Sequence, residues 1–421
     1  MYLSGKGIFS HTVSLHDTVS IVSDPPPEAD SRRSWGVALA GAIAMVFTFG
    51  TPLSYGIFQQ PFSETFAVSP VALSGVFSIM LFTFFIGSGL VGIFAARLPV
   101  RGVLLVCTVA TALLAPSLYV VESYLGLTLV FAGLGLALGT VFVLVASVVP
   151  RWFDERRGAA TGLIFVGNGL GLFVLPPLWQ YALSTAGVRE GFLVIMATTA
   201  GAFLLATLLC RRPPWATQST DSSSALLSWL SGLIRTRTFQ VLFVGMSLAF
   251  AWYQLLAAYA IDLFAARGLT EAGASALFGL IGGVSIISRI GGGYIADIVG
   301  SRRAFLASLG CAAVGIALLL APQYAILTVA VFIIGLGLGG CATLYIPLLM
   351  EIYNPEKDTA IIGIFNVAGG IGALAMPPLG TASVAYTESY TVAILLTLGV
   401  TVVSFWAVVV GTAGSVSTPS D

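Results

Sequence analysis

The sequence predicts an all-α membrane protein with twelve transmembrane helices in two pseudo-symmetric halves of six. Its composition is the first observation: 57% of the 421 residues are hydrophobic and 9% are charged, against about 25% charged residues in a soluble domain. The apolar residues also fall into twelve stretches long enough to cross a bilayer, and the second half of the chain repeats the first. Basic and acidic residues number 18 each, so no excess positive charge points to a nucleic-acid partner.

A transmembrane helix needs about 20 mainly apolar residues to cross about 30 Å of hydrocarbon. The candidates in the first half are 35–58, 71–94, 102–120, 124–148, 160–184 and 190–210. Those in the second half are 238–263, 272–295, 304–321, 324–348, 360–384 and 389–412.

These stretches divide the chain into two six-helix halves, a linker and two tails. We expect a flexible tail over 1–34, the first half over 35–210, a polar linker over 211–237, the second half over 238–412 and a short tail over 413–421. Within the linker, the apolar stretch Ala225–Ile234 predicts a short interfacial helix.

Basic residues predict the orientation of the spans, because short loops rich in Lys and Arg stay in the cytoplasm. Alternate loops and the tails hold Lys6, Arg32, Arg33, Arg97, Arg101, Arg151, Arg156, Arg157, Arg211, Arg212, Arg235, Arg237, Arg302, Arg303 and Lys357. The loops between them hold only Arg189 and Arg267. We therefore expect a multi-pass protein of the cell membrane with both termini in the cytoplasm. Arg289 is the one basic residue left within a span.

The repeat appears when the sequence is shifted by 201 residues against itself. GLIFVGNGLGLFVLPPL (162–178) then lies over GIFNVAGGIGALAMPPL (363–379), with several glycines and two prolines in register. Two related halves of the same topology are typical of transporters that hold their substrate between halves that tilt. The many glycines fit this interpretation, because small residues let helices approach closely in lipid.

The stretch GYIADIVGSRR (293–303) resembles the loop motif of the major facilitator superfamily. The matching residues are Gly293, Asp297, Gly300, Arg302 and Arg303. The resemblance implies a gating role, and we expect Asp297 to pair with an arginine or with a neighbouring helix N-terminus. The equivalent stretch of the first half, 92–101, has Ala96 in place of the acid and Pro99 in place of a glycine. We therefore expect the first half to have a weaker latch.

Within that superfamily, the stretches 51–58, 151–171 and 288–297 are similar to the monocarboxylate porters and the oxalate:formate antiporters. The resemblance implies alternating-access transport of a small organic anion, and it places Arg289 in the register of that group's eighth-span arginine. Two residues depart from the proton-coupled porters: Leu53 stands where they have a lysine, and Ser285 where they have an aspartate. The antiporters' eleventh-span lysine has no counterpart either, since 360–384 contains no basic residue.

Arg289 is the leading candidate for binding an anionic substrate. An arginine at the centre of a span costs about 2.5–3.5 kcal/mol to insert, and such residues usually face the bundle interior or a water-filled cavity. A guanidinium also offers a carboxylate two parallel hydrogen bonds. The repeat places Ser88 at the equivalent position of the first half. The alternative is structural: the long side chain snorkels to the cytoplasmic face.

Other candidate binding residues are polar or aromatic, and each also has a packing interpretation. They are Tyr55, Asn168, Trp252, Tyr253, Tyr345 and Asn366. The two asparagines either bind substrate or lock helices together. Asp262, near the outer end of the seventh span, fits a solvated carboxylate better than a proton carrier.

We therefore expect a transporter of a mono- or dicarboxylate that works by exchange or uniport as readily as by proton symport. Its partners would be the organic anion, a counter-anion or a proton, and membrane lipid. We expect a monomer with no metal and no cofactor. Efflux of amphipathic drug-like compounds is an alternative, and so is a non-transporting sensor on the same fold. An enzyme is disfavoured, because the spans contain no histidine, no clustered carboxylates and no GxSxG or HExxH motif.

Overall fold

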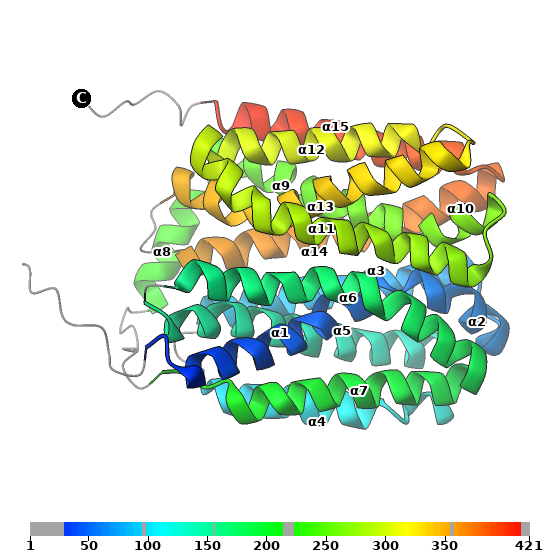
Figure 1. Ribbon diagram of the computed structural model, residues 1–421, viewed down its shortest axis with the longest axis horizontal. Helices are drawn as coiled ribbons and strands as arrows, with labels where there is room; N and C mark the ends of the chain where they lie inside the picture. Colours follow the sequence, from blue (N-terminus) through cyan, green and yellow to red (C-terminus); the bar gives the residue numbers. More distant parts are fainter. Residues whose placement is uncertain (1–28, 95–97, 155, 214–222, 354–357, 414–421) are drawn as a thin grey trace, which may run out of the picture.

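The computed structural model describes residues 29–94, 98–154, 156–213, 223–353 and 358–413, and all regular structure among them is helical. Twelve of the described helical segments are long and apolar enough to cross a membrane. They run side by side along one direction (Figure 1). The predicted fold class and number of spans are confirmed.

The long helices of the first half follow the predicted order closely. They are α1 (Arg32–Leu53), α3 (Pro70–Phe94), α4 (Val100–Leu114), α5 (Tyr124–Val148), α6 (Arg157–Ala186) and α7 (Val188–Leu209). Three shorter elements accompany them: α2 (Gly56–Phe66), η1 (Ser117–Tyr119) and η2 (Val149–Trp152).

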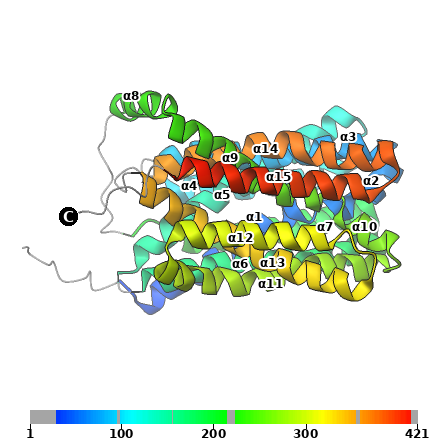
Figure 2. The ribbon, with the colours of Figure 1, turned by 90° about the horizontal axis from the view of Figure 1, so that it is seen from above.

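The second half has the same plan. Its helices are α9 (Arg237–Ala257), α10 (Ala260–Ala266), α11 (Glu271–Val299), α12 (Ser301–Leu318), α13 (Tyr324–Ile352), α14 (Asp358–Thr387) and α15 (Tyr390–Gly411). Between the halves, α8 (Ser223–Ile234) confirms a helix in the linker. It projects beside one end of the bundle (Figure 2).

The first and seventh spans are each interrupted, which the sequence analysis did not predict. The first breaks at Ser54 and Tyr55, shortly after Pro52, whose ring removes a backbone donor. The seventh breaks at Ala258 and Tyr259 without a proline. The breaks occupy corresponding places in the two halves, so short helices α2 and α10 follow them at the same end of the bundle (Figure 1).

The first span also begins earlier than predicted, at Arg32. Asp30, placed in the flexible tail by the sequence analysis, is bonded to the folded body. Its backbone N–H donates to the Trp152 carbonyl at 3.2 Å. Its carboxylate accepts from the backbone N–H groups of Asp154 and Arg156 at 3.0 and 3.2 Å. Residues 1–28, 214–222 and 414–421 lie outside the described residues.

Two helix pairs related by the repeat join the halves: α3 packs on α14, and α6 packs on α11. On α3 and α14, Gly89 and Gly363 meet so closely that a Cβ added to either would lie 2.8 Å from the other's carbonyl oxygen. Gly162 of α6 is the repeat partner of Gly363, yet no described atom lies within 4 Å of a Cβ added there. The same holds for Gly293 of α11. The halves therefore touch along α3 and α14 but separate between one end of α6 and α11.

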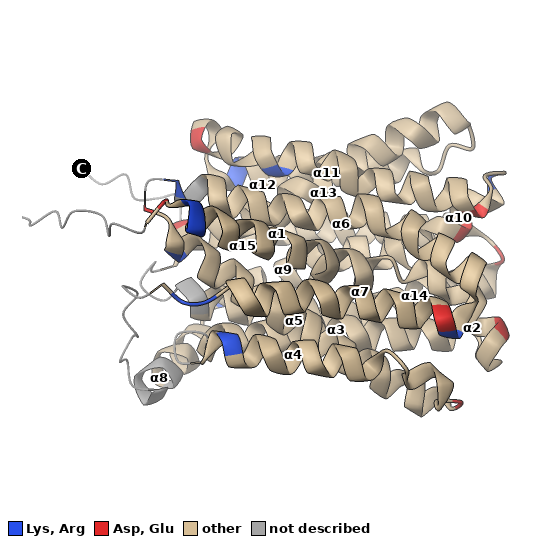
Figure 3. Ribbon diagram, turned by 60° about the horizontal axis from the view of Figure 1, so that its bottom comes forward, with Lys and Arg blue, Asp and Glu red and all other residues tan. Residues whose placement is uncertain are grey.

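Lys and Arg gather mainly at the end of the bundle where α1 begins and α15 ends (Figure 3). We call this the basic end. The opposite end carries α2 and α10, where Gly56 approaches the Ala257 carbonyl across the halves: an added Cβ would lie 3.1 Å from that oxygen. The halves are thus in contact at the end opposite the basic one.

Candidate functional site

A cavity lies between the halves, in the middle of the bundle. The empty space among its lining residues measures about 760 Å³, and this figure includes open solvent. Four helices of each half line it: α1, α3, α5 and α6, and α9, α11, α13 and α14. Much of the wall is apolar, which is typical of small-molecule sites with few polar groups.

Arg289 of α11 projects into this cavity and is 6% exposed. Its Nε–H donates to the Ser285 hydroxyl at 3.3 Å. Its Cζ lies 5.8 Å from the ring centroid of Phe49, on α1 of the other half. Nη1 and Nη2 are buried and have no hydrogen-bond partner in the part of the chain that the structure describes. A snorkelling arginine would place its head group at the bundle end, whereas this one presents two unused nitrogens to the cavity.

Ser285 holds Arg289 in this position. Its hydroxyl donates to the Gly282 carbonyl at 2.7 Å, and the same oxygen accepts the Arg289 Nε–H. Small residues surround it: a Cβ on Gly169 of α6 would lie 3.2 Å from the Ser285 hydroxyl oxygen. Because the partner is a neutral serine, the arginine is oriented without being neutralised. The sequence analysis recorded Ser285 only as a missing aspartate and did not recognise it as the partner of Arg289.

Four further side chains in the wall have a buried polar atom with no hydrogen-bond partner among the described residues, and one of them is the indole Nε1 of Trp252. The other three are more polar. They are the Tyr253 hydroxyl, the Asn168 Oδ1 and the Gln254 Oε1. Tyr253 is also close enough to Arg289 to interact with it electrostatically. Among the described residues that line the cavity, Arg289 alone is charged. Gln254 was missed in the sequence, although a glutamine after two aromatic residues within a span was a usable signal.

The remaining predicted binding residues divide into two groups. Trp252 and Tyr345 line the cavity. Asn366 also lines it, and its Nδ2 donates to the Ser88 hydroxyl across the interface at 3.0 Å. Tyr55 is not among the described residues that line the cavity in this conformation, and its binding role stays a prediction. Its hydroxyl donates to the Leu73 carbonyl at 2.7 Å and its ring stacks on Phe77 at 4.7 Å.

Asp262 does not share the cavity with Arg289. It lies on α10 in a separate hollow at the end opposite the basic one, together with Glu64, Glu271 and Gln180. Its side chain is exposed. Asp262 and Arg289 therefore belong to separate sites.

The loop motif is only partly engaged. Gly300 has φ of 87°, a left-handed backbone that favours glycine. Arg302 donates to the Val409 carbonyl at 3.3 Å and so ties α12 to α15. Within the described part of the chain Asp297 has no hydrogen bond and no ion pair, and Arg303 is exposed. The carboxylate that contacts the start of α12 is that of Glu351, which accepts from the Ser301 N–H at 3.1 Å. The described residues supply no partner of the expected kind for Asp297 in this conformation, and Ala96 lies outside them.

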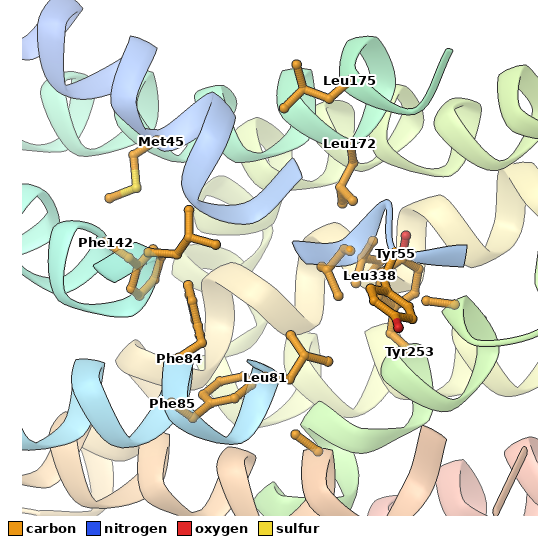
Figure 4. Packing of buried hydrophobic residues seen from close by; sticks show 14 of the residues in the cluster. Met45, Tyr55, Leu81, Phe84, Phe85, Phe142, Leu172, Leu175, Tyr253 and Leu338 are labelled. Atoms are coloured by element: carbon orange, nitrogen blue, oxygen red, sulfur yellow. The ribbon is translucent and has the colours of Figure 1, made fainter. Parts of the chain in front are cut away.

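Phenylalanine rings form much of the apolar wall, and none of them was among the candidates from the sequence. Figure 4 shows Phe84, Phe85 and Phe142 among the packed side chains in the middle of the bundle. Phe84 lies 5.3 Å from Phe85 and 5.6 Å from Phe142 between ring centroids. Phe85 in turn lies 5.6 Å from Phe250 of the second half. The rings thus cross the cavity from one half to the other.

The sequence matches the family model of the Major Facilitator Superfamily over residues 37–377 and 241–419. The chain belongs to the major facilitator superfamily. Solved structures agree in fold: a mutant of the nucleoside transporter NupG superimposes with a TM-score of 0.72 at 14% identity, covering 89% of this chain and 99% of that one. A bacterial homologue of the human lysosomal transporter Spinster gives 0.67 at 14% identity, covering 92% and 99%.

Curated relatives place the chain near the monocarboxylate porters. Monocarboxylate transporter 2 of Rattus norvegicus is 26% identical over 414 residues, covering 89% of this chain and 82% of its own. The MFS-type transporter pytF of Aspergillus terreus is 31% identical over 291 residues, covering 66% and 94%. The protein is therefore a multi-pass membrane transporter for a small molecule, of the major facilitator type and similar to the monocarboxylate porter group.

Proposed function

We propose that this protein transports a small organic anion by alternating access and that Arg289 binds the anion's carboxylate. One observation carries the proposal: a buried guanidinium faces the cavity between the halves with both Nη atoms unpaired. A buried charge without a partner is unfavourable. A carboxylate satisfies it, because its two oxygens accept one hydrogen bond from each nitrogen.

The same geometry favours exchange over net movement of the anion. With the anion bound, the charges of ligand and Arg289 cancel. Without it, the charged arginine must pass through the conformational change uncompensated, since its only side-chain hydrogen-bond partner among the described residues is the neutral Ser285. We expect the loaded carrier to reorient faster than the empty one. A counter-anion therefore fits this site better than the proton that a carboxylate at position 285 would carry.

The basic end is proposed to face the cytoplasm, by the Lys and Arg rule. Both termini and the linker would then lie on the cytoplasmic side of the cell membrane. At the proposed outer end the halves are in contact around Gly56, while at the proposed inner end α6 and α11 are apart around Gly162. The cavity would exchange with the cytoplasm in this conformation.

The aromatic wall also fits a second candidate function, the efflux of neutral amphipathic compounds. The two candidates differ at Arg289, which a neutral compound does not need. Dependence of binding on that residue therefore separates them.

The test uses the purified protein. Ligand-dependent thermal stabilisation measures its affinity for a carboxylate, and counterflow in proteoliposomes measures transport. Arg289→Lys keeps the charge but loses the planar fork. A charge-assisted hydrogen bond contributes about 1.5–3 kcal/mol, so we expect affinity for a carboxylate to fall about tenfold or more. Arg289→Gln should abolish transport. Arg235→Gln, at an exposed arginine outside the cavity, is the matched control. Parent-like affinity in both Arg289 variants would refute the proposal.

A further inference from the structure

The cavity wall has a second feature that bears on the ligand: a row of aromatic rings beside Arg289. Phe49 lies beneath the Arg289 guanidinium, 5.8 Å from ring centroid to Cζ. From Phe49 a chain of rings continues through Phe84 and Phe85 to Phe250, at centroid spacings of 6.4, 5.3 and 5.6 Å. Tyr345 ends the chain, 5.1 Å from Phe250. Each of these five residues lines the cavity.

These spacings fall in the range in which aromatic rings attract each other edge-to-face or offset, about 4.5–7 Å between centroids. A planar ring placed among them makes the same kind of contact. The carboxylate end of such a ligand lies at Arg289, where the Tyr253 hydroxyl is a further unpaired donor. One cavity thus offers a polar group for the carboxylate and an aromatic surface beside it, and Phe49 adjoins both.

The charge in the wall sets the number of carboxylates. Arg289 is the one charged group among the described lining residues. One carboxylate neutralises it. A second would have to leave water for ring faces, which carry negative electrostatic potential, with no cation to compensate it.

We infer that the preferred ligand is a monocarboxylate carrying an aromatic ring, bound with its carboxylate on Arg289 and Tyr253 and its ring against Phe49, Phe85 and Phe250. This inference rests on the proposed function, since it places the ligand's carboxylate on Arg289. It excludes dicarboxylates and makes short aliphatic acids poor ligands. It also explains why a cavity with one arginine is otherwise lined by so many rings.

Four probes test the inference by ligand-dependent thermal stabilisation of the purified full chain: phenylacetate, acetate, succinate and phenylacetamide. Phenylacetate should bind at least about tenfold more tightly than acetate, because acetate forgoes the ring contacts. Succinate should bind at least about 100-fold more weakly than phenylacetate. Phenylacetamide, a neutral molecule of the same shape, should also bind at least about tenfold more weakly.

One helix supplies a matched pair of variants. Phe250→Leu removes a ring of the cavity wall. Phe243→Leu removes a ring two turns away on the same helix, α9. That ring lies outside the cavity and packs on Phe239 and Phe365. We expect Phe250→Leu to weaken phenylacetate binding about two- to tenfold and to leave acetate unchanged. Phe243→Leu should change neither.

The outcomes distinguish this inference from the proposed function. If acetate or succinate binds as tightly as phenylacetate and Arg289→Gln abolishes that binding, the inference of an aromatic ligand is wrong and the proposed anion site at Arg289 is supported. If phenylacetamide binds as well as phenylacetate and Arg289→Gln changes neither, both are wrong. Absence of binding by phenylacetate at millimolar concentration would also overturn the inference.

Discussion

Gly363→Ala should shift the protein between conformations without unfolding it. In this structure the new Cβ would lie 2.8 Å from the Gly89 carbonyl oxygen, and ordinary contact begins at 3.4 Å. The halves must therefore separate locally by 3.4 − 2.8 = 0.6 Å. Overpacking of this kind costs about 1–3 kcal/mol, which corresponds to roughly a 5- to 150-fold change in a two-state equilibrium. Because the contact joins the two halves, tilting them apart relieves it.

Two other glycines provide the controls for this prediction. Gly162→Ala is the repeat-equivalent change, and its Cβ meets no described atom within 4 Å; we expect no shift. Gly139→Ala places its Cβ against the Phe84 carbonyl within the first half, closer than at Gly363. Tilting the halves cannot relieve that clash, so this variant should lose thermal stability.

Cys341 provides the assay, since it lines the cavity. With Cys107, Cys210 and Cys311 replaced by alanine, the rate of Cys341 modification by a small maleimide in detergent reports access to the cavity. Gly363→Ala should raise that rate by about the same factor as the equilibrium shift, while the melting temperature stays near that of the parent. The reasoning would be refuted if Gly363→Ala and Gly162→Ala gave equal rates, or if Gly363→Ala melted as early as Gly139→Ala.

Three further predictions concern topology and the motif loop. In a cysteine-free background, Ser63→Cys should react with an impermeant maleimide from outside intact cells and Ser231→Cys should not; strong external labelling of position 231 would reverse the orientation. Asp297→Asn should slow counterflow with little change in substrate affinity, because Asp297 has no partner among the described residues here and we expect its pairing in the other conformation; an unchanged rate would remove its gating role. Glu351→Gln should weaken the contact with the Ser301 N–H by about 0.3–1 kcal/mol and lower the melting temperature slightly, and a parent-like melting curve would contradict this.

The spans were predictable because hydrocarbon demands long apolar helices, and twelve stretches of the sequence meet that demand. Arg289 was predictable for the converse reason: a charge within such a stretch is rare and costly. The break after Pro52 had a local signal, whereas the break at Ala258 has none in the sequence.

The rings of the wall were not predictable, since 27 phenylalanines are spread along the chain. Only packing separates the ones in the cavity, such as Phe250, from those elsewhere, such as Phe243. The position of Tyr55 was not predictable for the same reason, since its hydroxyl donates to a backbone carbonyl within its own half. Asp30 was assigned to the tail because its neighbours in sequence are polar, and its partners lie more than 120 residues away in the chain.

The breaks that separate α2 and α10 from their long helices make the two ends of the bundle mechanically different. Opening the end at which they meet requires rotation of segments of 11 and 7 residues, a local motion with little displacement of lipid. Opening the basic end between α3 and α14 requires whole halves to tilt, and that motion must move the surrounding acyl chains. The rate of opening at the end that carries α2 and α10 should be nearly independent of bilayer viscosity. The rate of opening at the basic end should fall as the bilayer stiffens. The dependence of turnover on lipid saturation therefore indicates which end limits the transport cycle.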